Sequence, residues 1–162
     1  MDQEGIEMNG LGFHIPGRFD KILDISHCHL QGGSSNEIRN AIRAYALELG
    51  LSFFDPRSQE GFLRNLIIRN AGENELMVIL VFTKNDEASI QNMLEFLSNR
   101  FPEISSLIWL VNSKRNDTIY DLDFMVYKGK DHIIEKMDGL EFKVGPKSFF
   151  QTNSKQIGRA HV

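Results

Sequence analysis

The order of apolar patterns along the chain is the feature that most limits its fold. Two segments have the spacing of amphipathic helices, and short β-rich runs lie before, between and after them. From residues 21–25 to residues 104–111, the order of these elements is β-α-β-β-α-β. This order predicts an α+β domain of the split βαβ (ferredoxin-like) type, with an antiparallel sheet and two helices packed on one of its faces.

Both helices are predicted from end signals and from spacing. Ser34 and Glu37 have the form of a capping box at the start of the first helix. Asn85 or Asp86 can cap the second helix, and Pro102 ends it. The expected apolar stripes are Ile38, Ile42, Tyr45 and Leu49 in the first helix, and Ile90, Met93, Leu94, Leu97 and Phe101 in the second.

The strands are predicted from short runs of apolar and β-branched residues. Residues 11–15 and 21–25 flank Pro16-Gly17 in a hairpin-like pattern. Residues 104–111 are apolar enough to form a central strand that is buried on both faces. The remaining expected strands are residues 62–69, 76–82, 123–127, 132–137 and 140–144, of which the last three form a small C-terminal β meander.

Charge and cysteine content limit the classes of function. The formal net charge of −4 and the pI near 5.7 argue against a nucleic-acid module that binds through bulk charge alone. A single cysteine, Cys28, cannot form an internal disulfide and fits a reducing compartment. No apolar run is long enough to cross a bilayer, and the acidic start is unlike a signal peptide. We therefore expect a cytoplasmic, monomeric protein without a membrane partner.

No motif in the sequence forms a complete active site. The chain has no Gly-x-Gly-x-x-Gly phosphate loop, Gly-x-Ser-x-Gly nucleophile turn or His-Glu-x-x-His zinc helix. Asp121 and Asp123 would share one face of a strand, where a solvated pair is the more common explanation. His27-Cys28-His29 offers metal ligands, but adjacent side chains diverge, and a lone cysteine is more often a small buried residue.

Residues 139–154 hold the most informative motif. A strand pattern runs into Gly145-Pro146, and an aromatic pair and a side-chain amide follow. Pro146, Phe149, Gln151 and Asn153 match the pattern Pro-x-x-Phe-x-Gln-x-Asn. This combination resembles the signature that leads into the catalytic domain of RNA (uracil-5-)-methyltransferases.

The resemblance extends in one order over about residues 11–156. Gly12-Phe13-His14, residues 24–30, residues 64–69 and Asn116-Asp117-Thr118 carry it before the motif. Within the family, the chain is most similar to bacterial 23S rRNA (uracil-5-)-methyltransferases, whose Asp-x-x-x-Cys segment residues 24–30 resemble. The tRNA-modifying relatives lack the matching cysteine, so tRNA is the less favoured target.

The resemblance implies a function that the fold alone does not. The chain would be the central, RNA-facing part of an S-adenosyl-L-methionine-dependent methyltransferase that methylates C5 of a uridine in rRNA. It would be truncated before the catalytic domain and inactive alone. Gln151 would contact S-adenosyl-L-methionine, and Phe149 would lie beside the active site and contact the RNA. Cys28 would bind a [4Fe–4S] cluster whose other three thiolates lie outside this chain.

Lysine residues gather in the expected meander. Lys128, Lys130 and Lys147 are candidates for RNA contact there, together with Lys143. A solvated lysine surface is the more common explanation for such a cluster.

Three segments and one alternative function follow from these patterns. We expect residues 1–117 to form the split βαβ domain and residues 118–156 to form a meander that leads into a methyltransferase domain outside the chain. Residues 157–162 lack a helical stripe and are expected to be a non-native tail. The alternative is a stand-alone split βαβ module that binds RNA or protein. Against it, residues 64–69 are largely aliphatic where an RNA-binding sheet would expose aromatic residues.

Overall fold

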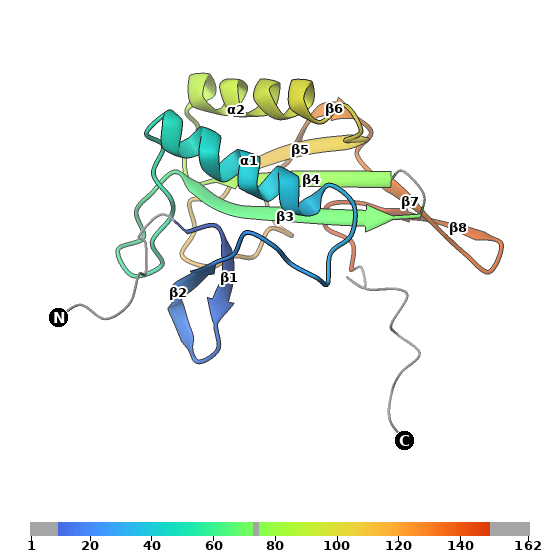
Figure 1. The fold of residues 1–162 in the computed structure, drawn as a ribbon. Helices are drawn as coiled ribbons and strands as arrows, with labels where there is room; N and C mark the ends of the chain where they lie inside the picture. Colours follow the sequence, from blue (N-terminus) through green and yellow to red (C-terminus); the bar gives the residue numbers. More distant parts are fainter. Residues whose placement is uncertain (1–9, 73–74, 150–162) are drawn as a thin grey trace.

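Residues 10–72 and 75–149 are described by the computed structural model, which has an α+β fold (Figure 1). The elements in chain order are β1 (Gly12–Ile15), β2 (Arg18–Asp24), α1 (Ser35–Glu48), β3 (Leu63–Ala71), β4 (Glu75–Phe82), α2 (Glu87–Arg100), β5 (Ser106–Val111), β6 (Met125–Gly129), β7 (Ile133–Met137) and β8 (Leu140–Val144).

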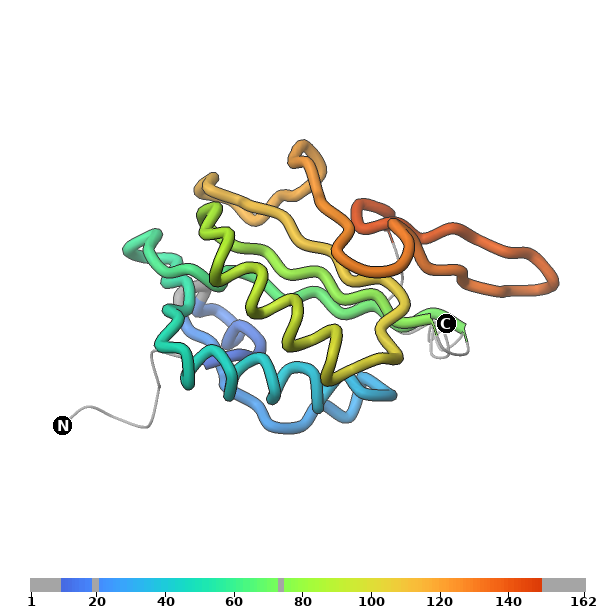
Figure 2. Tube along the Cα trace, turned by 90° about the horizontal axis from the view of Figure 1, so that it is seen from above, coloured from blue at the N-terminus to red at the C-terminus, as the bar shows by residue number. Residues whose placement is uncertain are grey.

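A four-stranded sheet with the order β3-β4-β5-β6 organises the described part of the chain. Strands β4 and β5 are parallel and are connected through α2, whereas β3 and β6 pair antiparallel to their neighbours. Both helices lie on the same face of this sheet (Figures 1 and 2). The hairpins β1–β2 and β7–β8 form two separate two-stranded sheets.

The α+β class and the two helices on one face are confirmed, but the strand pairing differs from the split βαβ arrangement. Residues 21–25 were expected as the first strand of the main sheet, but residues 21–24 belong to β2, which pairs only with β1 among the described strands. Leu23 of β2 is 55% exposed, so this strand does not have the burial of a sheet interior. The resulting four-stranded sheet is mixed rather than antiparallel.

The expected C-terminal meander is also divided. Only β7 and β8 form a hairpin, whereas β6 extends the main sheet by pairing with the free edge of β5. Gly129 ends β6 with φ +78°, and a Cβ at this position would overlap the carbonyl oxygen of Ser105. This close approach lets the chain leave the sheet and begin the hairpin.

Two apolar cores cover the two faces of the sheet. The helix-side core contains Ile38 and Ile42 of α1 and the stripe of α2, together with Val78, Leu80, Phe82 and Leu107. The opposite core contains Met77, Ile79, Val81, Ile108, Leu110 and Ile119, together with Ile133 and Val144 of the β7–β8 hairpin. Strand β5 contributes to both cores, which confirms the prediction of a central strand buried on both faces.

The ends of the helices show one local prediction that holds and one that fails. Asp86 caps α2, because its carboxylate accepts hydrogen bonds from Ser89 N (3.3 Å) and Ser89 Oγ (2.9 Å). The capping box expected at Ser34 is wrong. Ser34 makes no side-chain cap, and its Oγ instead donates to Glu103 Oε1 at 2.6 Å. Glu103 is a strong acceptor just beyond α2, and it replaces the local backbone donor as the partner of Ser34.

The predicted apolar stripes of both helices are confirmed except at one position of α1. Ile38, Ile42 and the stripe of α2 are buried, whereas Leu49 is 42% exposed and Ala46 takes a buried place on α1. Tyr45 is half-buried and stacks on Phe96 of α2, with ring centroids 4.0 Å apart. Neither described helix is both long enough and apolar enough to span a membrane.

Candidate functional site

A groove of about 790 Å³ opens between the β1–β2 hairpin and the main sheet. Four segments form its walls: the β1–β2 hairpin, residues 53–59, the start of β3, and the loop of residues 112–117 after β5. Its lining combines aromatic, arginine and amide side chains. We take this groove as the candidate site because it is larger than the hollow of about 450 Å³ beside Tyr45 and Phe96 and combines apolar walls with polar side chains.

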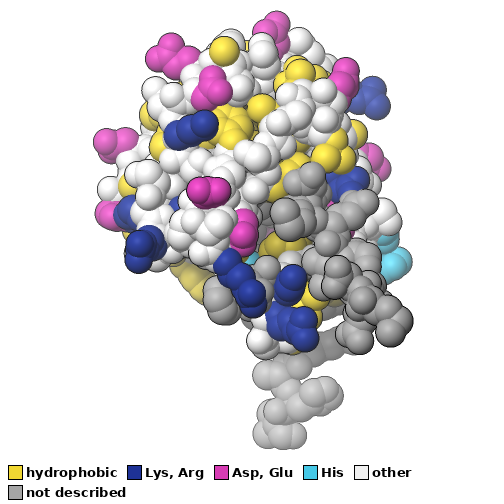
Figure 3. Space-filling view, turned by 90° about the vertical axis from the view of Figure 1, so that its left-hand side faces the viewer, with side chains coloured by type: hydrophobic (Ala, Val, Ile, Leu, Met, Phe, Trp, Pro, Cys, Tyr) yellow, Lys and Arg dark blue, Asp and Glu magenta, His cyan; other side chains and the backbone are white. Residues whose placement is uncertain are grey.

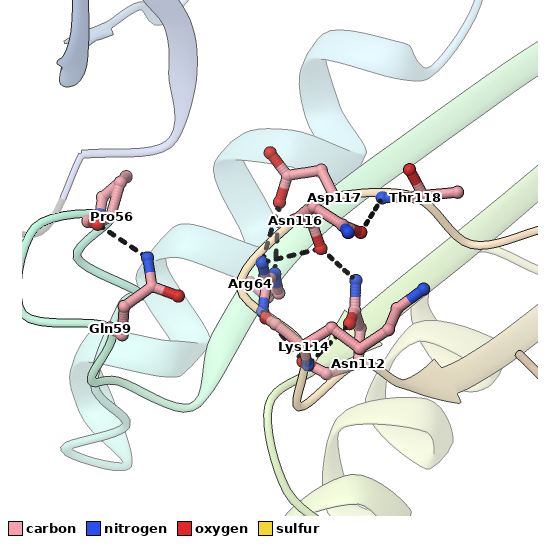
Figure 4. Close-up of polar contacts among 8 residues, drawn as sticks. All are labelled: Pro56, Gln59, Arg64, Asn112, Lys114, Asn116, Asp117 and Thr118. Carbon is pink, nitrogen blue, oxygen red and sulfur yellow. Dashed lines mark hydrogen bonds and ion pairs between the residues drawn. The ribbon is translucent and has the colours of Figure 1, made fainter.

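Arg64 holds one wall of the groove in place (Figure 4). Its Nη1 donates to the carbonyl oxygens of Asn112 (3.0 Å) and Lys114 (2.6 Å), and its Nη2 donates to that of Asn116 (3.0 Å). Nε and Nη2 also contact Asp117 Oδ1 at 3.2 and 3.1 Å. The side chain is 2% exposed, and its guanidinium carbon lies 4.3 Å from the ring centroid of Phe54. Arg64 therefore fastens the 112–117 loop to β3.

The 112–117 loop is also ordered by its own asparagine residues (Figure 4). Asn112 is fully buried, and its Nδ2 donates to Asn116 O at 2.9 Å while its Oδ1 accepts from Lys114 N at 3.0 Å. Asn116 Oδ1 accepts from Thr118 N at 3.1 Å. In the sequence, Asn116-Asp117-Thr118 was recognised only as part of the family resemblance, and no structural role was predicted for Asn112. The signal that could have revealed their role is the pair of asparagines, which often bond to nearby backbone in turns.

A tight turn forms the wall opposite this loop. The Asp55 carboxylate accepts hydrogen bonds from Arg57 N (2.9 Å) and Ser58 N (3.4 Å). These bonds lower the pKa of Asp55, and the bond from Arg57 has the larger effect. Gln59, at φ +61°, donates from Nε2 to Pro56 O at 2.7 Å (Figure 4). The wall is thus held by local hydrogen bonds.

Two arginines at the groove carry charge without a described partner. Arg18, at the start of β2, and Arg115, in the 112–117 loop, are exposed. Neither makes an ion pair or a side-chain hydrogen bond within residues 10–72 and 75–149. Lys and Arg side chains gather in the lower half of the face that Figure 3 shows. This region is locally positive on a chain with a net charge of −4.

The lysines predicted to contact RNA do not lie around this groove. Lys128 Nζ donates to the carbonyl oxygens of Pro102 (3.2 Å) and Ser98 (3.5 Å), at the C-terminal end of α2. Lys147 Nζ lies 5.6 Å from the ring centroid of Phe124. Lys130 is exposed. The first two therefore have contacts that explain their positions, and an RNA-binding role for the three stays a prediction.

Cys28 lies in the loop between β2 and α1 and is hydrogen-bonded to Asn36 in the first turn of α1. It is 9% exposed, its N–H donates to Asn36 Oδ1 at 2.7 Å, and its carbonyl oxygen accepts from Asn36 Nδ2 at 3.3 Å. No group of three His, Cys, Asp or Glu side chains that could hold a metal is found among the described residues. A [4Fe–4S] cluster needs four thiolates, and the chain has one, so these residues cannot hold a cluster alone.

The segment leading to the Phe-x-Gln-x-Asn motif is held by Arg69. Its Nη1 donates to the carbonyl oxygens of Gly145 (2.7 Å) and Ser148 (3.0 Å), and burial lowers the pKa of its guanidinium. Phe149 directly after this turn is 82% exposed. Gln151, predicted to contact the methyl donor, and Asn153 lie outside the described residues. Residues 157–162, the expected tail, also lie outside them.

The chain is similar over nearly its whole length to proteins named as RNA methyltransferases. No family model matches the sequence. The chain is 56% identical over 153 residues to an uncharacterized RNA methyltransferase of Bacteroides thetaiotaomicron, covering 93% of this chain and 34% of that protein. It is 32% identical over 152 residues to the tRNA (uracil(54)-C(5))-methyltransferase of Pyrococcus furiosus, covering 93% of this chain and 35% of that protein.

The fold of this chain is also similar to that of a solved structure. The crystal structure of Pyrococcus abyssi tRNA (uracil-54, C5)-methyltransferase in complex with S-adenosyl-L-homocysteine matches with a TM-score of 0.70 and 31% sequence identity. The match covers 91% of this chain and 35% of that one. The chain thus spans about a third of the length of the relatives that it matches.

Proposed function

Because this chain belongs to the RNA (uracil-5-)-methyltransferase family, we propose that it forms the RNA-facing central part of an enzyme that methylates C5 of a uridine. The observation that carries the proposal is a similarity in both sequence and structure. Nearly the whole chain superposes on about one third of the Pyrococcus abyssi enzyme, with a TM-score of 0.70 and 31% sequence identity. The shared fold alone would not support a function.

The chemistry explains why other parts of the enzyme must take part. Uracil C5 is a weak nucleophile, so a cysteine thiolate first adds to C6, and a base later removes the C5 proton as the thiol leaves. S-adenosyl-L-methionine supplies the methyl group when bound. The thiol of this chain, Cys28, is buried in the loop between β2 and α1 and is poorly placed to reach a substrate. We therefore propose that the chain alone is inactive and that it binds and orients the RNA.

Two residues of the C-terminal motif have proposed roles at the junction with the catalytic part. Phe149 is exposed and follows a turn held by Arg69, which supports a role in contact with the RNA or the active site. Gln151 has both a donor and an acceptor and is proposed to contact the methyl donor. Gln151→Ala in a complete enzyme would leave a partner unpaired at about 1–3 kcal/mol, or roughly a ten- to hundredfold loss in kcat/KM.

The class of RNA is a separate part of the proposal. We favour rRNA because residues 24–30 resemble the Asp-x-x-x-Cys segment of the rRNA-modifying members. The similar Pyrococcus proteins are tRNA (uracil-54, C5)-methyltransferases, which makes tRNA the second candidate. The two targets predict methylation of different purified transcripts, so one assay separates them.

A chimaeric enzyme tests the function. Residues 10–156 of this chain replace the matching third of the Bacteroides thetaiotaomicron relative, and the product is incubated with S-adenosyl-L-methionine and either 23S rRNA or tRNA transcripts. We expect 5-methyluridine by mass spectrometry in one RNA, and none with this chain alone. A chimaera that folds but leaves both RNAs unmethylated, while the intact relative methylates one, would contradict the proposal.

A further inference from the structure

We propose that the groove beside the β1–β2 hairpin binds a single-stranded stretch of RNA, with phosphates on Arg18 and Arg115 and a base on Phe13. This inference rests on the proposed function, because it names the surface through which the chain would contact its substrate. It differs from the prediction made for the lysines of the C-terminal segment, which lie elsewhere on the molecule.

The charge of the groove fits a phosphate backbone. Three arginines and one aspartate contribute to its lining, and Arg64 and Asp117 are paired with each other. The charges of Arg18 and Arg115 remain uncompensated among the described residues. An exposed arginine without an internal partner can bind a phosphate without first breaking an ion pair. Because the chain as a whole has a net charge of −4, its attraction for RNA would depend on these local arginine charges and not on the net charge.

An exposed aromatic residue accompanies these charges. Phe13 of β1 is 51% exposed and lines the groove, and Leu23, its partner on β2, is 55% exposed. Unpaired RNA bases stack on aromatic side chains, whereas the faces of bases in a duplex are already stacked on neighbouring base pairs. A base on Phe13 would cover part of this exposed apolar pair, which favours a single strand over a duplex.

The groove is largely preformed. The hydrogen bonds of Arg64 hold the loop that carries Arg115, and the Asp55 turn holds the opposite wall. Arg18 lies next to Gly17 in the tight turn of the β1–β2 hairpin. Binding therefore does not require the walls to fold, which lowers the entropic cost of holding an RNA strand.

Fluorescence anisotropy with a labelled 12-nucleotide single-stranded RNA tests the proposal on the 162-residue chain. We expect the Arg18→Gln/Arg115→Gln variant to reduce the slope of log K against log salt by about 1.4, at about 0.7 for each lost phosphate contact. We expect Phe13→Ala to weaken binding roughly five- to hundredfold without changing that slope. The same sequence as an RNA duplex should bind more weakly than the single strand.

A matched variant removes the same charge from a distant surface. Arg100→Gln/Lys136→Gln, in the last turn of α2 and on β7, lies outside the groove lining and should change neither the affinity nor the slope by a comparable amount. Melting temperatures of all variants show that each one is folded. Loss of binding in Lys130→Gln/Lys147→Gln, with the groove variants unchanged, would assign RNA contact to the lysines and overturn the proposal.

Two further outcomes would also overturn the groove proposal. One is absence of RNA binding by the chain at low salt. The other is normal RNA binding by the groove variants combined with destabilisation of the chimaeric enzyme, which would make the groove a contact with another part of that enzyme. Methylation by the chimaera is measured separately, so failure of the groove leaves the proposed function standing.

Discussion

Arg69 on β3 donates from Nη1 to the carbonyl oxygen of Gly145, 76 positions later in the chain, at a distance of 2.7 Å. The same nitrogen donates to Ser148 O at 3.0 Å. The end of the β7–β8 hairpin is thereby attached to the edge strand of the main sheet. Phe149, one residue further on, directly follows this turn, and its side chain is 82% exposed.

Replacement of Arg69 by methionine should loosen the hairpin. Arg69→Met keeps an apolar stem but removes the donors to two carbonyl oxygens, so we expect the free energy of unfolding to fall by about 1–3 kcal/mol. Hydrogen exchange should become faster at the amides of β7 and β8 and stay slow in β4 and β5. Lys136→Met, at a side chain that is 71% exposed, is the control and should change stability by less than about 0.5 kcal/mol. Unchanged exchange in β7 and β8 would contradict the role given to Arg69.

Arg64 should be sensitive to the shape of its head group and not only to its charge. A lysine cannot reproduce the fork that reaches three carbonyl oxygens of the 112–117 loop, so Arg64→Lys should lower stability by about 1.5–3 kcal/mol. Asp117→Asn should lower it by less than about 1 kcal/mol, because the Asp117 side chain is 62% exposed. Urea unfolding of both variants measures the difference. Equal losses would mean that the ion pair, and not the carbonyl contacts, holds the loop.

Ile108 should contribute strongly to the core opposite the helices. It is fully buried on β5, and Ile108→Ala should lower the free energy of unfolding by about 2–5 kcal/mol through the cavity that it leaves. Its cross-strand partner Val126 is 41% exposed, and Val126→Ala should have a much smaller effect. Thermal and urea unfolding of the two variants test this order, which would be reversed if β6 and not β5 carried the core.

The Asp86 cap at the start of α2 should make the free energy of unfolding depend on pH in the acidic range. Hydrogen bonds from the side chain and backbone of Ser89 lower the pKa of Asp86 from its ordinary value of 3.8. Since the pKa is lower in the folded state, the stabilisation is present above the unfolded pKa and is lost as the pH falls through the folded one. Asp86→Asn keeps an acceptor at the cap but cannot titrate.

The melting temperature of Asp86→Asn should therefore fall less between about pH 5 and pH 2.5 than that of the unaltered chain. At pH 7 the two proteins should melt at similar temperatures. Asp138→Asn, at the exposed turn between β7 and β8, is the matched control for loss of a carboxylate. An unchanged acid dependence in Asp86→Asn would show that the cap does not contribute to it.

Local patterns in the sequence were sufficient for the elements themselves. The stripe of Ile90, Met93, Leu94 and Leu97 and the cap at Asp86 depend on residues within a few positions of each other, and both appear in the structure. The same holds for the Pro16-Gly17 hairpin and for the burial of β5 on both faces. The C-terminal motif and the other matches also led to the family that the comparisons show.

The pairing of the strands and the walls of the groove depend on contacts between residues far apart in the sequence, so local patterns did not predict them. Residues 21–25 have a strand pattern, but a strand pattern does not choose its partner, and the edge of β5 is paired by β6 instead. Ser34 has the local form of a cap, yet a carboxylate 69 positions away is its partner. Arg64 was recognisable only as a charged residue in an apolar run. Its role comes from three carbonyl oxygens about 50 positions away, which only the tertiary structure brings within hydrogen-bonding distance.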